Sequence, residues 1–169
     1  AEERHNILES GDDKVFKHVL KPIIIKIITD EINSRKFTIL DIGCFTGYLT
    51  NIVGGLCNKI VGIDPSEKSI ILAKTKNTVD NVEFLCTNLQ EFAESNNASI
   101  DLAFSHMSLH TIEDLSGSIL SISKVLNRNG YLVFSIPHPC FWNGLKLTLE
   151  FSDYSYPNNS FHKNKFKLA

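Results

Sequence analysis

The sequence lacks a charge excess, a CxxC cysteine pair and any apolar run long enough to cross a membrane. Seventeen basic residues stand against nineteen acidic ones, which leaves a net charge of −2. A chain without a basic field has little to drive binding to nucleic acid. The four cysteines are scattered, so zinc-type spacing is absent. No apolar stretch approaches the ~20 residues of a membrane span. The sequence therefore predicts neither nucleic acid, nor a metal, nor a membrane as a partner.

The composition that remains is that of an ordinary globular domain. The chain has 169 residues, of which 43% are hydrophobic and 21% are charged. A chain of this size buries roughly 70% of the surface that its unfolded form exposes, so it can build a sizeable core. Unpaired cysteines in such a core indicate a reducing compartment, and we expect a cytoplasmic protein.

Short apolar strands alternate with amphipathic helices along the chain. This alternation is typical of an α/β protein with a Rossmann-like, doubly wound and mostly parallel sheet that carries helices on both faces. Ligands of such sheets bind outside the carboxyl ends of the strands. The expected strands are 37–40, 59–63, 82–85, 100–105 and 131–136, and the expected helices include 12–32 (kinked at Pro22), 67–76 and 114–126.

The apolar spacing within these helices predicts which residues face the core. For the first helix the near-3.6 spacing favours Val15, Val19, Ile23 and Ile27. The other two predicted inner faces are Ile70, Ile71 and Leu72, and Leu115, Ile119, Ile122 and Leu126.

The loop after the first strand carries the clearest ligand signal. The strand ends in Asp41, and the loop that follows has glycines at positions 43 and 47. A dinucleotide fingerprint G-x-G-x-x-G fails, because Phe45 and Tyr48 replace two glycines, and no P-loop lysine follows. A ligand with a cationic end suits Asp41 better than a phosphate does. The alternative is a tight strand-to-helix turn in which glycine only relieves strain.

Residues 38–50 resemble motif I, D-x-G-x-G-x-G, of the class I S-adenosylmethionine-dependent methyltransferases. Asp41, Gly43 and Gly47 match the motif, and Phe45 replaces its middle glycine. The likeness runs from residue 11 to about residue 141. It implies that these residues and Cys44 contact S-adenosylmethionine, whose methyl group passes to a small-molecule acceptor by in-line displacement.

Two other function classes stay open at this stage. A catalytically inactive S-adenosylmethionine-binding or regulatory module would account for Phe45 in the glycine loop. A nicotinamide-dependent oxidoreductase would share the fold, but the failed G-x-G-x-x-G fingerprint weighs against it.

Polar residues follow the next two strands as well. Asp64 ends the second strand about 20 residues after Gly43, where a carboxylate can accept two hydrogen bonds from a ribose diol. The resemblance further implies that Pro65 packs on adenine, and that the Asn88 side chain and Leu89 backbone contact the adenine edge. The alternative for Asp64 and Asn88 is a helix cap or turn.

Histidines dominate the ends of the last two strands. Ser105 and His106 follow the fourth strand, where the resemblance implies the methionine end of the cofactor and the acceptor. His138 lies between two prolines after the fifth strand. We predict His106 and His138 as candidate catalytic groups, with structural histidines as the alternative. Cys140 lacks the partners of a nucleophile. The [DNS]-P-P-[YFW] motif of methyltransferases that act on amino groups of nucleic-acid bases is absent, which weighs further against such bases as the acceptor.

We expect three parts: a helical cap over residues 1–36, a cofactor-binding core over 37–136, and a cleft-covering loop or hairpin over 137–169. Alternating apolar residues at 145–151 favour the hairpin. The family resemblance implies a seven-stranded sheet that ends in an antiparallel pair. Since few residues follow the fifth strand, we expect this chain to lack that pair.

Overall fold

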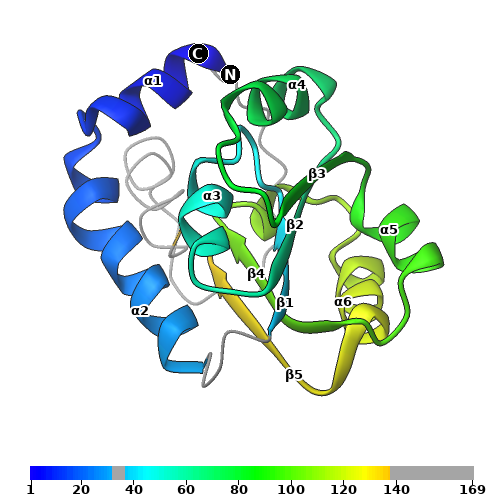
Figure 1. Cartoon of the computed structure of the whole chain (residues 1–169). Coiled ribbons are helices and arrows are strands. Elements are labelled where there is room, and N and C mark those ends of the chain that lie inside the picture. Colours follow the sequence, from blue (N-terminus) through cyan, green and yellow to red (C-terminus); the bar gives the residue numbers. More distant parts are fainter. Residues whose placement is uncertain (32–36, 138–169) are drawn as a thin grey trace, which may run out of the picture. The chain divides into compact units, whose positions relative to one another are not determined.

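Five parallel strands form the centre of the computed structural model, which describes residues 1–31 and 37–137 (Figure 1). Their order across the sheet is β3-β2-β1-β4-β5. The expected α/β, Rossmann-like fold is confirmed. The strands are β1 (Thr38–Ile42), β2 (Lys59–Asp64), β3 (Val82–Cys86), β4 (Ile100–His106) and β5 (Leu126–Ser135).

The strand order reverses between β1 and β4, which places a topological switch point at the carboxyl end of β1. The chain moves from β1 outward to β2 and β3, then returns to pair β4 with the other side of β1. The register aligns Ile42 with Ile63, and Asp64 with Cys86. Loops that leave β1, β2 and β4 therefore meet at one edge, which is where such sheets bind ligands.

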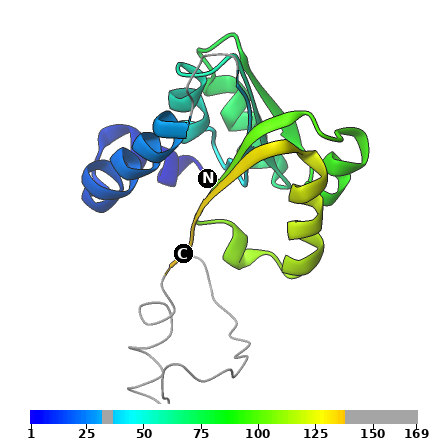
Figure 2. The ribbon, with the colours of Figure 1, turned by 90° about the horizontal axis from the view of Figure 1, so that it is seen from below.

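Helices cover both faces of the sheet within the unit Ala1–Ile136 (Figure 1; Figure 2). Neighbouring strand residues point to opposite faces: Ile39 packs with one core cluster and Leu40 with the other. This explains the nearly continuous apolar composition of the strands. One cluster includes residues of α2 (Lys21–Glu31), α3 (Tyr48–Gly54) and α4 (Glu67–Lys76), and the other includes residues of α5 (Leu89–Ser95) and α6 (Leu115–Val125).

Side-chain caps fix where the helices of the core begin. The Ser66 hydroxyl accepts a hydrogen bond from the backbone N–H of Ser69 (3.3 Å) at the start of α4. The Asp114 carboxylate accepts from the backbone N–H of Gly117 (2.9 Å) at the start of α6. Such caps satisfy N–H groups that the first helical turn leaves unpaired. The predicted range 67–76 for α4 is confirmed.

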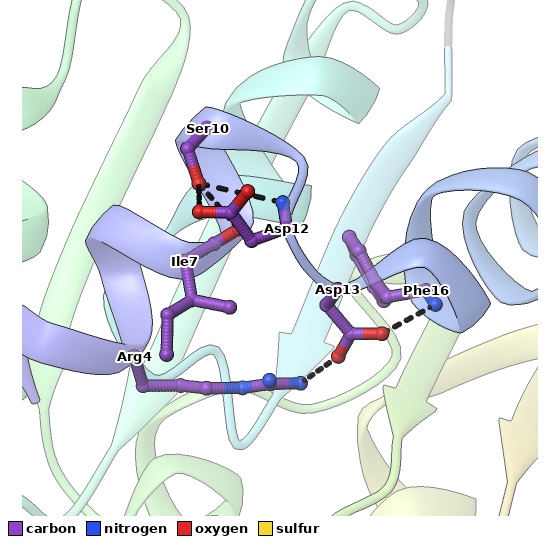
Figure 3. Close-up of polar contacts among 6 residues, drawn as sticks. All are labelled: Arg4, Ile7, Ser10, Asp12, Asp13 and Phe16. Atoms are coloured by element: carbon purple, nitrogen blue, oxygen red, sulfur yellow. Dashed lines mark hydrogen bonds and ion pairs between the residues drawn. The ribbon is translucent and has the colours of Figure 1, made fainter.

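The N-terminal segment forms three helical pieces, of which the first lies before the predicted helix 12–32. These are α1 (Glu2–Ser10), the π-helical η1 (Phe16–Leu20) and α2, and Pro22 lies in the first turn of α2, where proline is tolerated. Figure 3 shows the junction of α1 and η1: Arg4 pairs with Asp13 (2.7 Å), and Asp13 accepts from the backbone N–H of Phe16 (2.8 Å). The junction thereby fixes the start of η1.

The predicted inner face of the first helical segment is wrong by one residue. Val15 and Ile23 are 61% and 52% exposed, as are Val19 (48%) and Ile27 (43%), whereas Phe16, Ile24 and Ile28 are buried. With the partly buried Leu20 included, the buried set also repeats every four residues, so spacing alone does not select between the two sets. Burying Phe16 removes more apolar area from water than burying Val15 would. This favours the observed helix frame, in which Phe16, Ile24 and Ile28 face the core.

Two further predicted helix faces are corrected in part. Ile70 and Ile122 are buried as predicted, but Ile71 (58%), Leu115 (50%) and Ile119 (45%) are exposed. The last strand begins earlier than expected, because β5 starts at Leu126 and not at residue 131. The register between β4 and β5 shifts after Ile100, so residues 127–130 form an irregularity in β5.

Several expectations fall on residues 138–169 and lie outside the described part of the chain: His138, Cys140 and the cleft-covering hairpin. Within the described residues, no helix combines the length and apolarity that crossing a membrane requires.

Candidate functional site

The loop from Gly43 to Gly47, between β1 and α3, forms the centre of the candidate site. Gly43 (φ 76°) and Gly47 (φ 73°) both adopt the left-handed conformation that glycine favours. A Cβ on Gly47 would lie 2.4 Å from the Phe84 ring, so a larger residue does not fit there. The N–H groups of Gly43 and Cys44 donate to the Ile63 carbonyl (2.9 and 3.0 Å), which ties the loop to β2.

Phe45 stands where the motif has its middle glycine. It adopts a left-handed conformation (φ 51°), which costs a residue with a Cβ about 1–2 kcal/mol. Its backbone N–H donates to Asp64 Oδ2 (3.0 Å). The loop therefore keeps the backbone turn that glycine would allow, and a contact with the next strand end holds it.

Asp64 ends β2 and joins the ends of two strands. Oδ2 accepts from Phe45, and Oδ1 accepts from the backbone N–H of Ser66 (2.9 Å). The helix N-cap considered for Asp64 is wrong, because Ser66 caps α4; the Asp64 carboxylate closes the turn before that cap. Each carboxylate oxygen offers more than one acceptor site, so hydroxyl donors can still bind. The half-buried carboxylate fits the ribose diol of S-adenosylmethionine, and that contact stays a prediction.

Asp41 supplies a second, buried carboxyl group at the end of β1. It is 3% exposed, and the Thr50 hydroxyl donates to its Oδ2 (2.6 Å). Burial raises the pKa of Asp41 to about 7, the Thr50 hydrogen bond acts against this shift, and the nearby Asp64 charge adds to it. Two carboxyl groups so close together favour a ligand with a cationic part, as the sulfonium and amino groups of S-adenosylmethionine provide.

Asn88 begins α5 with a capping box. Its side-chain oxygen accepts from the backbone N–H of Glu91 (2.9 Å), and the Glu91 carboxylate accepts from the backbone N–H of Asn88 (3.3 Å). The cap considered for Asn88 is therefore present. Contacts of adenine with Asn88, Leu89 and Pro65 stay predictions; Pro65 is exposed and Leu89 is buried (4%).

Ser105 and the Cys44 thiol contact the protein itself. The Ser105 hydroxyl donates to the Ile42 carbonyl (3.0 Å) and is 1% exposed, so it ties β4 to the end of β1. The Cys44 sulfur lies 3.8 Å from the Phe45 carbonyl oxygen, and burial raises the pKa of its thiol well above the usual range. Because both side chains bond to the protein, the predicted contacts of Ser105 and Cys44 with the cofactor are those of their backbone atoms.

His106 ends β4 at the same edge. Its Nδ1 lies 2.6 Å from the Ser135 hydroxyl, and its ring packs against Phe16, with centroids 5.6 Å apart. Burial lowers the pKa of His106; the nearby Arg4 charge lowers it further, and Asp13 raises it. The imidazole is thus neutral near pH 7, with one nitrogen held by serine.

Sequence reasoning missed the contribution of α1 to this site. His5 is 2% exposed, its Nδ1 lies 2.8 Å from the Thr46 hydroxyl, and its ring meets Tyr48 edge-on at 6.4 Å. Phe16 also meets Tyr48 edge-on, at 5.9 Å. The N-terminal helices therefore pack on the glycine loop. The α1 segment is rich in charged residues and shows no periodic pattern of apolar residues. The lone His5 among them is the one sequence feature that pointed to a contact with the site.

No group of three or more His, Cys, Asp or Glu side chains that could hold a metal ion occurs within residues 1–31 and 37–137.

Comparison with known proteins identifies the family. Residues 40–134 match the protein family described as "Methyltransferase domain". The malonyl-[acyl-carrier protein] O-methyltransferase of Priestia megaterium is 34% identical over 126 residues, which cover 72% of this chain and 44% of that protein. The enzyme of the same name from Acetivibrio thermocellus is 34% identical over 124 residues, 72% of this chain and 42% of that protein. This chain thus matches less than half the length of these relatives.

Solved structures show the same fold. An S-adenosylmethionine dependent methyltransferase from Mesorhizobium loti has a TM-score of 0.58 and 24% identity, covering 68% of this chain and 54% of that chain. A SAM dependent methyltransferase from Aquifex aeolicus has a TM-score of 0.56 and 19% identity, covering 64% and 61%. Motif, topology and family match agree: this chain belongs to the class I methyltransferases, with S-adenosylmethionine as the cofactor.

Proposed function

We propose that the chain transfers the methyl group of S-adenosylmethionine to a small acyl group, and that the acceptor atom is a carboxylate oxygen of a malonyl thioester. The observation that carries the proposal is the Asp64 carboxylate in contact with the glycine loop, with Asp41 beside it. This arrangement fits a donor with a ribose and a cationic end. The choice of acceptor rests on the two relatives whose names specify malonyl-[acyl-carrier protein].

The residues proposed to hold the cofactor follow the strand ends. Asp64 binds the ribose, Asp41 faces the cationic end, and the backbone from Gly43 to Gly47 lines the ligand. Pro65, Asn88 and Leu89 surround the adenine. When bound, the cofactor supplies a methyl carbon already activated by positive sulfur. The protein then has to align donor and acceptor and exclude water.

A carboxylate acceptor needs no general base, because it is ionised at neutral pH. With Ser135 donating to Nδ1, the neutral His106 ring carries its proton on Nε2 and can donate to the acceptor carboxylate. Arg4 lies close enough to His106 to influence its pKa, but its charge is paired with Asp13 (2.7 Å). We propose His106 as a contact of the acceptor, and His138 as a second candidate outside the described residues.

A neutral hydroxyl acceptor is the second candidate, and the neutral imidazole of His106 favours it. Such an acceptor must lose a proton. In the other tautomer of His106 the proton is on Nδ1 and is donated to the Ser135 hydroxyl, which leaves Nε2 free to take the proton of the acceptor at neutral pH. The two acceptors differ in their response to His106→Gln. The amide of glutamine still donates a hydrogen bond to a carboxylate, but it does not act as a base.

Two further proposals concern the cellular compartment and the class of acceptor. Cys44, Cys57 and Cys86 are free thiols, which supports a reducing compartment such as the cytoplasm. The net charge of −2 supports an acceptor other than nucleic acid.

The test is methyl transfer from labelled S-adenosylmethionine to malonyl-loaded acyl-carrier protein. The acetyl-loaded carrier is the matched control, since it lacks only the free carboxylate. We expect label in a base-labile methyl ester with the malonyl carrier and none with the acetyl carrier. Binding of S-adenosylmethionine without transfer to the malonyl carrier would contradict the proposed acceptor. A loss of at least about a hundredfold in kcat for His106→Gln would favour the hydroxyl acceptor.

A further inference from the structure

The loop that carries the candidate site contains a strained residue. Phe45 has a φ of 51°, at the position where the motif has a glycine, which adopts such angles as readily as negative ones. For a residue with a Cβ, the cost of the left-handed conformation corresponds to a population about 5- to 30-fold lower. Strain of this kind persists only where neighbouring contacts hold it. The contacts around Phe45 therefore decide how often the loop has the observed conformation.

Two contacts hold the backbone around Phe45. Its backbone N–H donates to Asp64 Oδ2 (3.0 Å) at the end of β2. The next residue, Thr46, is 1% exposed, and its hydroxyl oxygen lies 2.8 Å from Nδ1 of His5 in α1. A hydroxyl both donates and accepts, so this hydrogen bond forms whichever ring nitrogen carries the proton. The strained turn is thus tied to the sheet by its N–H group and to α1 by the side chain that follows it.

His5 is the residue through which α1 reaches the loop. It is 2% exposed, while the residues on either side of it in α1 are exposed. Its Nε2 lies 3.2 Å from a carboxylate oxygen of Glu9, outside the geometry of a hydrogen bond, so that contact is electrostatic. The directed polar contact of the ring is the one with Thr46. Since buried polar groups need hydrogen-bond partners, the ring and the hydroxyl satisfy each other.

We propose that His5 is a positioning residue for the cofactor: through Thr46 it holds the loop in the conformation that binds S-adenosylmethionine, and it thereby compensates for the missing middle glycine of the motif. Without this contact the Phe45 backbone relaxes toward negative φ, and its N–H turns away from Asp64. The apparent Kd then rises as the fraction of protein with the binding conformation falls. The inference rests on the proposed path of the cofactor along residues 43–47 and not on the acceptor.

A purely structural role for His5 is the alternative, in which the residue anchors α1 and leaves the loop unchanged. The two roles differ in what responds to the loss of the contact. Loss of an anchor lowers the free energy of unfolding and leaves the affinity for the cofactor as it was. Loss of a positioning contact raises the Kd, and it does so only while the residue at position 45 is strained.

The first test measures the Kd of S-adenosylhomocysteine by isothermal titration calorimetry in the intact chain. Thr46→Val keeps the branched shape and removes the hydroxyl, and Thr46→Ser keeps the hydroxyl as the matched control. We expect Thr46→Val to raise the Kd at least about fivefold and Thr46→Ser to change it less than about twofold. In a Phe45→Gly background, Thr46→Val should change the Kd less than about twofold, because glycine needs no support at this φ.

Variants of His5 test the other end of the contact. Asparagine places a polar atom near the position of Nδ1, whereas glutamine places one near that of Nε2. His5→Asn should keep the Kd within about threefold of wild type. His5→Gln should raise the Kd as much as Thr46→Val does, and combining the two should raise it no further. Glu9→Gln removes the charge beside Nε2 without changing Thr46, and it should change the Kd less than about twofold.

Hydrogen exchange of the Phe45 amide, measured without ligand, gives a readout that does not depend on the cofactor. We expect exchange at least about fivefold faster in Thr46→Val than in wild type. Unchanged Kd values in Thr46→Val and His5→Gln would overturn the proposal, and so would an equal rise in Kd with and without Phe45→Gly. If wild type does not bind S-adenosylhomocysteine, the proposed cofactor path fails. The exchange rate then decides the hold of His5 on the loop: faster exchange supports it and an unchanged rate overturns it.

Discussion

Cofactor binding should weaken as the pH falls below 7, because Asp41 must ionise to meet the ligand. In the free protein, burial and the Asp64 charge raise the pKa of Asp41 to about 7. A cationic ligand beside the carboxylate favours the charged form and lowers its pKa in the complex. Binding then releases a proton, so protons compete with S-adenosylmethionine below the raised pKa.

The size of the effect follows from the raised pKa of the free protein. If that pKa is about 7 and Asp41 is ionised throughout this range in the complex, the Kd should rise about eightfold between pH 7.5 and pH 6. The amino group of the ligand is protonated over most of this range, since α-amino groups titrate near 8. The carboxyl group of Asp41 therefore accounts for most of the change.

Isothermal titration calorimetry measures both the affinity and the proton released. The matched variant Asp41→Asn keeps an oxygen to accept from Thr50 but has no ionisable group at this position. We expect its affinity to be lower than that of wild type and nearly constant between pH 6 and pH 7.5. Titrations in buffers of different ionisation enthalpy should show close to one proton released by wild type at pH 6. An equally flat profile for wild type, with no proton release, would refute this account of Asp41.

Three further predictions concern the strand ends and the helix frame. Asp64→Ala removes a charged hydrogen-bond acceptor and should raise the Kd for S-adenosylhomocysteine between about tenfold and a hundredfold while circular dichroism is unchanged; an unchanged Kd contradicts the ribose contact. Gly43→Ala places a Cβ 2.0 Å from the Ser108 hydroxyl oxygen at φ 76°, so urea unfolding should show a loss of at least about 1–2 kcal/mol, and adding Ser108→Gly should recover only the steric part. Ile28→Ala should cost about 2–5 kcal/mol, because this side chain is 0% exposed, whereas Ile27→Ala (43% exposed) should cost less than about 1 kcal/mol; equal costs would contradict the observed helix frame.

The sequence was most informative where local chemistry and tertiary packing agree. The helix over residues 67–76 was predicted with the observed bounds, and the structure shows the Ser66 cap at its start. The strands were predictable because both faces of the sheet are covered, which gives short apolar runs. Asp41 and Gly43 could be placed at a ligand-binding edge because parallel strands share one carboxyl end.

The remaining features depend on contacts between residues far apart in the sequence. The frame of the first helical segment depends on Phe16 packing with Tyr48 and His106, which the four-residue spacing does not reveal. His5 became part of the site through Thr46, 41 residues away in the sequence. Ser105 ties two strands together, because its hydroxyl reaches the Ile42 carbonyl, which is 63 residues away in the sequence; its contact with the cofactor stays a prediction.

A crystal structure of the intact protein with S-adenosylhomocysteine tests the central claim most directly. The account predicts ribose hydroxyls within hydrogen-bond distance of the Asp64 carboxylate, and the amino end of the ligand beside Asp41. The backbone from Gly43 to Gly47 should line the ligand between these two carboxylates. A ligand bound at the amino ends of the strands, or one whose ribose lies away from Asp64, would contradict the account.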